Sequence, residues 1–311
     1  MNLVLLQQAL NRIKALVDGA ILNSGYTNSA NVFTLVANGN NGNEALTRFT
    51  RSELHILPIH EVVKSSIGEI LDVPHLIYPE AGTIHVPIKS NELKVPMYGQ
   101  PKNQDVTIVF TEQERGEGNE GLYWNNDRTR VDIEDVEVAS RCITVGVRST
   151  LRSIANNINT LTERTGAEAL LQRAIRGMEK SVKGEVYILA AREYNKVSAA
   201  NQTLQWNNHG VIEQYIQNFL GMSNRPTFRE EDQYDWHDNV RYERAALIVV
   251  DFSQEPPLFY RNLRQMFDDE LVTEEFYNQY HQGYDGELSP VNFAEDLVNS
   301  HSRQWPELYE E

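Results

Sequence analysis

The amino-acid sequence predicts a protein of the α+β class, in which a long helix packs on an antiparallel sheet. Three observations support this prediction. Apolar residues recur at three- and four-residue steps over residues 165–196, as they do on one face of a helix. Short β-rich runs separated by proline and glycine fill residues 73–148. The uninterrupted apolar run 245–250 is typical of a strand that is buried on both faces.

The long helix is the element around which the rest is expected to pack. Thr165 and Glu168 have the spacing of a capping box at its start. Gly177 and Gly184 lie inside it, each at a cost of about 1 kcal/mol relative to alanine, so we expect a bend or the close approach of another segment there. Its apolar face consists of Ala167, Leu170, Leu171, Ala174, Ile175, Met178, Val182, Val186 and Leu189.

Composition limits the classes of protein to consider. With 311 residues and 41% hydrophobic content, the chain has room for one large or two medium domains. No apolar run approaches the roughly 20 residues that span a bilayer. The apolar start, residues 1–20, carries polar residues at helical spacing, which favours an amphipathic helix over a signal peptide. The single cysteine, Cys142, excludes a disulfide framework and indicates a reducing compartment.

Charge is unevenly distributed along the chain, whose formal net charge is −16. Residues 251–311 hold fourteen acids against three arginines, a net −11, whereas residues 141–200 hold ten Lys or Arg against five Glu, a net +5. A nucleic-acid reader with a wholly basic domain is therefore excluded, but one basic surface remains compatible with the sequence.

Residues 1–44 are interpreted as an N-terminal arm. A helix with the apolar residues Leu3, Leu6, Leu10 and Ile13 on one face precedes a connector rich in Asn, Gly and Ser. Because this connector separates the face from the rest of the chain, we expect the face to bind a neighbouring subunit. Residues 45–72 contain a second predicted helix at 59–71, with Pro58 near its start, where a missing N–H donor is harmless.

Residues 73–130 are predicted to form an extended β-hairpin. The strand candidates are 75–78, 83–88, 94–97 and 105–110. Pro87 and Pro96 indicate exposed or edge strands, because proline cannot donate to a ladder. Alternation of apolar residues over 131–147 then predicts a long hairpin or sheet extension that returns to a better buried strand. This strand is expected to lead into the long helix, and residues 131–200 are interpreted as one domain.

Residues 201–311 are interpreted as a second domain followed by an acidic region. A short amphipathic helix at 211–220 and the buried strand 245–250 belong to it. Pro256 and Pro257 are expected to open a helix that continues through Phe267. The remainder is acidic and rich in aromatic residues that can pack, so we do not expect it to be disordered.

Motifs of catalysis are largely missing from the sequence. It contains neither GxxxxGK[ST] nor GxGxxG, and no GxSxG nucleophile elbow. His55 and His60 are five residues apart with Pro58 between them, which is not the spacing of two metal ligands on one helix face. The acidic loop with Asp232, Asp235, His237 and Asp238 is interpreted as a solvated loop rather than as a cation site. We therefore assign no catalytic, cofactor-binding or metal-binding residue and do not expect an enzyme.

A metal-dependent DNA endonuclease is the alternative. Its best candidates are Asp132, Glu134 and Glu137, whose carboxylates could hold the metal ions. The usual acid-x-Lys step is missing, because Ala139 stands two residues after Glu137.

The order of elements resembles that of the major capsid proteins of tailed phages with the HK97-type fold. Residues 136–147 followed by 167–194 look like the strand and the spine helix of the family's peripheral domain, and the hairpin 73–130 looks like its E-loop. Residues 209–220 and 245–251 look like elements of its axial domain. The resemblance covers about residues 54–266 and rests on pattern. After Phe267 the chain departs from the family, which returns to the sheet at this point.

The resemblance implies a structural virion protein without catalysis. Its copies would form pentamers and hexamers of an icosahedral shell around phage DNA, together with other capsid or portal components, and the shell would assemble in the host cytoplasm. In such a shell the basic stripe of Arg173, Arg176, Lys180 and Lys183, which recurs at three- and four-residue steps, is expected to face the DNA without reading its sequence. Cofactors and membranes have no part in this prediction.

Overall fold

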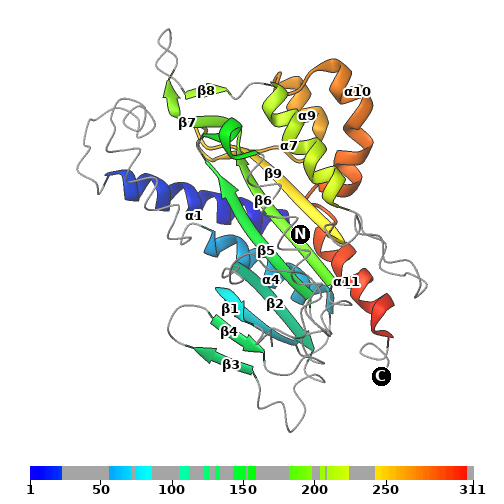
Figure 1. Ribbon diagram of the computed structural model, residues 1–311. Helices are drawn as coiled ribbons and strands as arrows, with labels where there is room; N and C mark the ends of the chain where they lie inside the picture. Colours follow the sequence, from blue (N-terminus) through cyan, green and yellow to red (C-terminus); the bar gives the residue numbers. More distant parts are fainter. Residues whose placement is uncertain are drawn as a thin grey trace, which may run out of the picture.

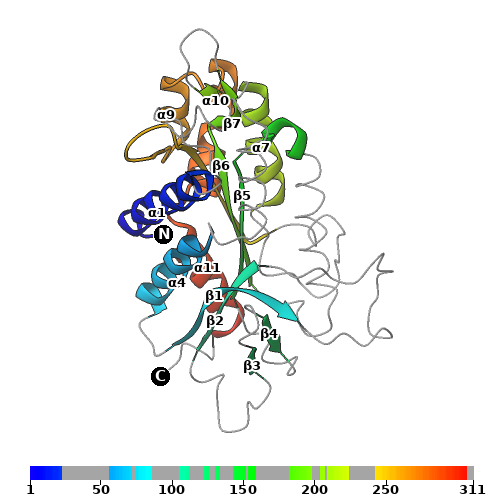
Figure 2. The same cartoon turned by 90° about the vertical axis from the view of Figure 1, so that its left-hand side faces the viewer.

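The fold is mixed α/β, with one sheet between two layers of helices (Figures 1 and 2). The prediction that helices and strands combine in this chain is therefore confirmed. The computed structural model describes residues 1–22, 56–71, 75–85, 105–111, 122–125, 130–133, 143–151, 153–158, 182–197, 204–206, 209–223 and 242–306.

The sheet has eight strands among the described residues, in the order β10-β9-β6-β5-β2-β1-β4-β3. At its centre β5, β6 and β9 are parallel, whereas the β1–β2, β2–β5, β3–β4 and β9–β10 pairs are antiparallel. The prediction of an antiparallel sheet is therefore wrong for the buried centre. The strands are β1 His75–His85, β2 Asp105–Thr111, β3 Leu122–Asn125, β4 Arg130–Ile133, β5 Ile143–Thr150, β6 Val182–Ala190, β9 Arg244–Asp251 and β10 Leu258–Phe259.

Helices cover both faces of this sheet. The α1, α4 and α11 helices lie on one face, and α7 lies on the other (Figure 2). The helices are α1 Leu3–Leu22, α4 Leu57–Leu71, α7 His209–Met222, α9 Leu263–Asp268, α10 Glu274–Gly283 and α11 Phe293–Gln304, with a π-helical turn, η2 Tyr284–Leu288, between the last two. None of the helices that the structure describes has the length and apolar character of a membrane-spanning segment.

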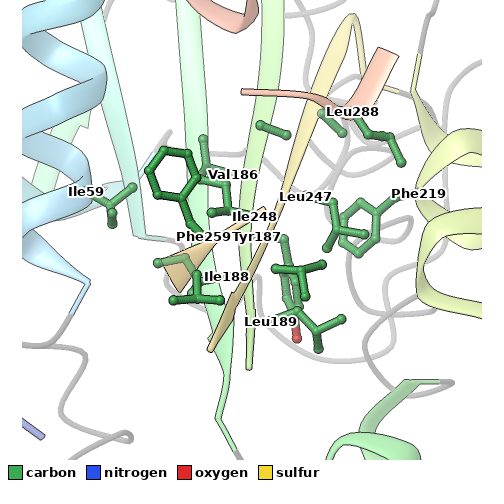
Figure 3. Packing of buried hydrophobic residues seen from close by; sticks show 14 of the residues in the cluster. Ile59, Val186, Tyr187, Ile188, Leu189, Phe219, Leu247, Ile248, Phe259 and Leu288 are labelled. Carbon is green, nitrogen blue, oxygen red and sulfur yellow. The ribbon is translucent and has the colours of Figure 1, made fainter. Parts of the chain in front are cut away.

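Alternation along β6 divides the core between the two layers. Figure 3 shows Tyr187 and Leu247 on the side of Phe219, which belongs to α7, and Val186 and Ile188 on the side of Ile59 in α4. Every residue of β6 and of β9 is buried. The prediction that 245–250 is a strand buried on both faces is therefore confirmed.

The long helix predicted over 165–196 is wrong for its second half, because 182–190 form β6 and Arg192–Val197 form β7. A parallel strand buried on both faces lacks period-two alternation, so Val182, Val186 and Leu189 also fit helical spacing. Residues 165–181 lie outside the described part of the chain. The expected close approach at Gly184 is confirmed in a strand: a Cβ there would lie 2.8 Å from Cδ1 of Leu297 in α11.

The N-terminal helix is confirmed, but its apolar face is not free. Leu6, Leu10 and Ile13 are fully buried in the chain's own core, and Leu3 packs against that core. Their cover includes α4, which packs directly on α1. The interpretation of this face as an arm that binds another subunit is therefore replaced by an intramolecular role. The connector that follows lies outside the described residues.

Most other predicted elements are confirmed with shifted ends. The predicted helices at 59–71 and 211–220 are present as α4 and α7, and β1 and β2 pair antiparallel as a hairpin. The helix expected to begin at Pro256 is wrong at its start, because Leu258 and Phe259 first pair with β9 and the helix begins at Leu263. The aromatic C-terminal region is helical and packs into the core, as expected.

Candidate functional site

A charged pair lies within the sheet where β5 and β6 run side by side. Nη1 of Arg148 donates to Oε1 of Glu185 at 2.7 Å, and the Glu185 side chain is 1% exposed. Gly146 leaves the space for this carboxylate, because a Cβ at that position would overlap it. Burial works against the charge of Arg148, but Glu185 and Tyr242 more than offset it and raise the pKa of the guanidinium. The pair therefore remains ionised and joins the two strands.

Lys183 lies on the same face of β6 and is fully buried. Its backbone N–H donates to Oε2 of Glu243, and the backbone N–H of Glu243 donates to the Lys183 carbonyl at 3.0 Å. Both bonds fasten β6 to the segment that enters β9. The prediction that Lys183 faces packaged DNA is therefore wrong. Arg173, Arg176 and Lys180 lie outside the described residues.

A second pair joins β9 to α11 on the opposite face of the sheet. Nε of Arg244 donates to Oδ2 of Asp296 at 2.7 Å, and its other nitrogens donate to the carbonyls of Ala245 and Ser289, each at 2.9 Å. Burial lowers the pKa of Arg244, although Asp296 works in the opposite direction. Three acceptors hold one guanidinium, so Arg244 fits a structural role that fixes α11 and the turn before it to β9.

A third pair stands at the carboxyl ends of the parallel strands, the edge where open α/β sheets bind ligands. Asp251 is buried at the end of β9 and accepts from Nε of Arg192 at 3.0 Å. It also accepts from the backbone N–H and the hydroxyl of Ser253, at 2.9 and 2.6 Å. Arg192 begins β7, which pairs with β8 (Leu204–Trp206) in a separate two-stranded sheet. Asp251 thus anchors this hairpin and turns the chain after β9.

The candidates for an endonuclease are only partly placed. Asp132 stands in β4, in register with His85 of β1 on one side and Tyr123 of β3 on the other. Glu134 and Glu137 lie outside the described residues. In the part of the chain that the structure describes, no group of three His, Cys, Asp or Glu side chains could hold a metal ion.

The histidine candidate for a metal ligand belongs to the core. His60 is fully buried in α4, and burial lowers the pKa of its imidazole to about 3. His55 and the acidic loop at 232–238 lie outside the described residues. The neutral His60 ring therefore fits a packing role.

An open groove of about 310 Å³ lies between α1 and α4. Ion-paired Arg12 and Glu61, 2.9 Å apart and both more than half exposed, belong to its lining. Small-molecule sites enclose most of their ligand and place few convergent polar groups in an apolar wall. The groove has neither property and is not a candidate active site.

Sequence reasoning missed the three ion pairs, each of which has at least one buried member. Arg148, Glu185 and Asp251 each stand inside or directly after an apolar strand, which is an available signal because a buried charge requires a partner. The identity of each partner follows only from strand pairing. We found no family model, curated protein or solved structure that matches the chain.

Proposed function

We propose that the chain is a structural subunit that self-assembles into a closed shell around DNA, as major capsid proteins of the HK97 type do. One observation carries the proposal. The sheet continues from its buried parallel centre into an extension of β2, β1, β4 and β3, which ends far from the helices α7, α9 and α10 (Figures 1 and 2).

The extension favours assembly because short outer strands are poor at stabilising themselves. β3 and β4 each have four residues, and β3 pairs with β4 alone among the described strands. An edge strand presents unpaired backbone groups that pair readily with another chain. A neighbouring copy that covers this edge would supply the missing partners.

The three ion pairs, each with at least one buried member, favour a scaffold over an active site. Each pair joins elements that are distant in sequence: Arg148 with Glu185, Arg192 with Asp251, and Arg244 with Asp296. Charges that are already paired and hydrogen-bonded inside a core are held in fixed geometry. This rigidity suits a subunit whose shape must stay constant when it is part of a shell.

The HK97-type assignment requires a modified arrangement here. A spine helix that begins at Thr165 has to end before Val182, where β6 starts, and is therefore about half as long as the sequence pattern predicts. Contacts between subunits would come from the β1–β4 extension, since the apolar face of α1 is used internally. Weak, salt-sensitive contact with DNA would come from Arg173, Arg176 and Lys180 without Lys183. Pentamers and hexamers, portal contacts and a virion location belong to the same proposal.

A metal-dependent endonuclease is the second candidate, on the observation that Asp132 and His85 are register partners on adjacent strands. Glu134 and Glu137 follow in sequence and would complete an acidic group.

Light scattering after size exclusion, with electron microscopy of the same fractions, separates the two candidates. Shells or rings of subunits are expected, together with no cleavage of plasmid DNA in Mg²⁺. A dispersed monomer that cleaves DNA, and loses that activity in Asp132→Asn, would refute the shell and establish the endonuclease.

A further inference from the structure

Stacked rings join α9 and α10. The ring centroids of Phe267 and Tyr277 are 5.1 Å apart with an interplanar angle of 24°, and those of Tyr277 and His281 are 5.1 Å apart at 28°. The guanidinium of Arg264 lies 5.3 Å from the Phe267 ring and 5.7 Å from the Tyr277 ring. We call Phe267, Tyr277 and His281 the aromatic strip; all three side chains are partly exposed.

The helices α9 and α10, which carry the strip, lie at one end of the molecule, opposite the β3–β4 end (Figures 1 and 2). Phe267 and Tyr277 pack against the core with part of their surface and leave the rest exposed. Aromatic residues that keep one face in water are enriched at protein interfaces, where they add large contact area at little entropic cost. The strip therefore has the composition of an interface.

Exposed carboxylates occur on the same two helices as the strip and in the turn between them. The exposed acids on α9, α10 and the turn between them are Asp268, Asp269, Glu270, Glu274 and Glu275. Asp268 pairs with Arg264 at 2.9 Å, and Asp269 accepts from the Tyr260 hydroxyl at 2.9 Å. Among the described residues, the side chains of Glu270, Glu274 and Glu275 have no partner. These five acids outnumber Arg264 and give α9, α10 and the turn a net negative charge; we call them the acidic rim.

Helix capping explains only part of this charge. Glu274 and Glu275 occupy the first turn of α10, where the helix dipole favours acids. Glu270 has no such role, because it lies two residues after the end of α9 with a φ of 56°, a conformation that glycine adopts at lower cost. Its carboxylate is kept at a position where the backbone would favour a residue without one.

We propose that the aromatic strip and its acidic rim bind a cationic segment of a second copy of this chain. The chain itself supplies the complementary charge: residues 141–200 hold ten Lys or Arg against five Glu. Arg148 and Arg192 are ion-paired within the described chain and Lys183 is buried there, and the other seven lie outside the residues whose side chains the structure describes. Guanidinium and ammonium groups bind aromatic faces and carboxylates at once. DNA is excluded as the occupant, since the rim would repel phosphate.

This inference rests on the proposed self-assembly and specifies one of its contacts. Sedimentation velocity over a range of protein concentrations, at low and high salt, measures the self-association directly. The test protein is the full chain carrying Glu270→Gln, Glu274→Gln and Glu275→Gln together. Its matched control is Glu295→Gln, which removes an exposed acid from the first turn of another helix, α11.

The wild-type chain is expected to associate at low salt and to dissociate as salt rises, because charged pairs at an interface rim are screened. The triple variant is expected to associate about tenfold more weakly, whereas the control is expected to match the wild type. Tyr277→Leu, which retains apolar volume but removes the ring face, is expected to weaken association without changing the salt dependence.

Two outcomes would show which proposal is wrong, the closed shell or the contact through the aromatic strip. A wild-type chain that stays monomeric at every concentration overturns the proposed shell and this contact with it. A wild-type chain that assembles, and a triple variant that assembles equally well, overturns the contact alone.

Discussion

Acid should destabilise this protein through a single core residue, His60. Its imidazole is fully buried in α4, and burial lowers its pKa from 6.5 to about 3. In the unfolded chain the ring binds a proton as pH falls through 6.5, whereas in the folded chain it does so only near pH 3. The unfolded state therefore binds more protons between these values, and the free energy of unfolding falls as pH decreases.

The size of the effect follows from the two pKa values. Each unit of separation corresponds to about 1.4 kcal/mol, so His60 lowers the free energy of unfolding by roughly 2 kcal/mol at pH 5 and roughly 4 kcal/mol at pH 3, where the folded state is itself half protonated. This loss is a large share of the 5–15 kcal/mol that typically separates folded from unfolded chains. Stability at pH 7.5 is unaffected.

Urea unfolding at pH 7.5, 6.5, 5.5 and 5.0 measures this loss when the wild type is compared with His60→Leu. The variant changes packing and hydrogen bonding by an amount that is the same at every pH. The readout is therefore how the difference in unfolding free energy between the two proteins changes with pH. We expect the variant to gain about 2 kcal/mol relative to the wild type between pH 7.5 and 5.0. His209→Gln, at an exposed histidine in the first turn of α7, serves as the control and should follow the wild type. Parallel curves for the wild type and His60→Leu would refute the placement of a neutral imidazole in the core.

Three further changes test the packing. Leu10→Ala should lower the free energy of unfolding by about 2–5 kcal/mol, because Leu10 is fully buried. Val4→Ala, at a 68% exposed position, should change it by less than about 0.5 kcal/mol. Equal effects of the two variants in urea titrations would contradict the placement of α1. Gly184→Ala should cost about 1–3 kcal/mol by overpacking against α11, measured by calorimetry against Gly286→Ala, whose Cβ meets nothing within 4 Å. Glu270→Gly should raise the melting temperature, by relief of about 1 kcal/mol of backbone strain; an unchanged or lower melting temperature would show that the carboxylate stabilises the monomer.

Local pattern was sufficient for most elements but not for β6. The apolar positions of 182–189 fit a helix, and Lys183 and Glu185 between them fit its polar face. The structure buries these two charged residues as well, which no propensity predicts, because their partners come from β5 and from the segment before β9. Tertiary pairing therefore overrode the local period at this strand.

The role of α1 illustrates a different limit. The pattern correctly identifies which side of the helix is apolar, but it does not identify the surface that covers this side. That surface includes α4, which is separated from α1 by more than thirty residues of sequence. An apolar helix face at the start of a chain is compatible with its own core and with a partner, and only contacts distant in sequence decide between them.

The pair of Arg148 and Glu185 explains how β5 and β6 find one register when both are buried on two faces. Apolar alternation specifies register weakly in such strands, since either face accepts apolar residues. A slip by one residue would move the Glu185 carboxylate to the face that Phe293 and Leu297 of α11 occupy, and would remove it from both Arg148 and the space left by Gly146. An unpaired buried carboxylate costs several kcal/mol, far more than a misplaced methyl group. The pair thus contributes mainly specificity: it penalises the wrong pairing of two strands whose apolar residues would tolerate it.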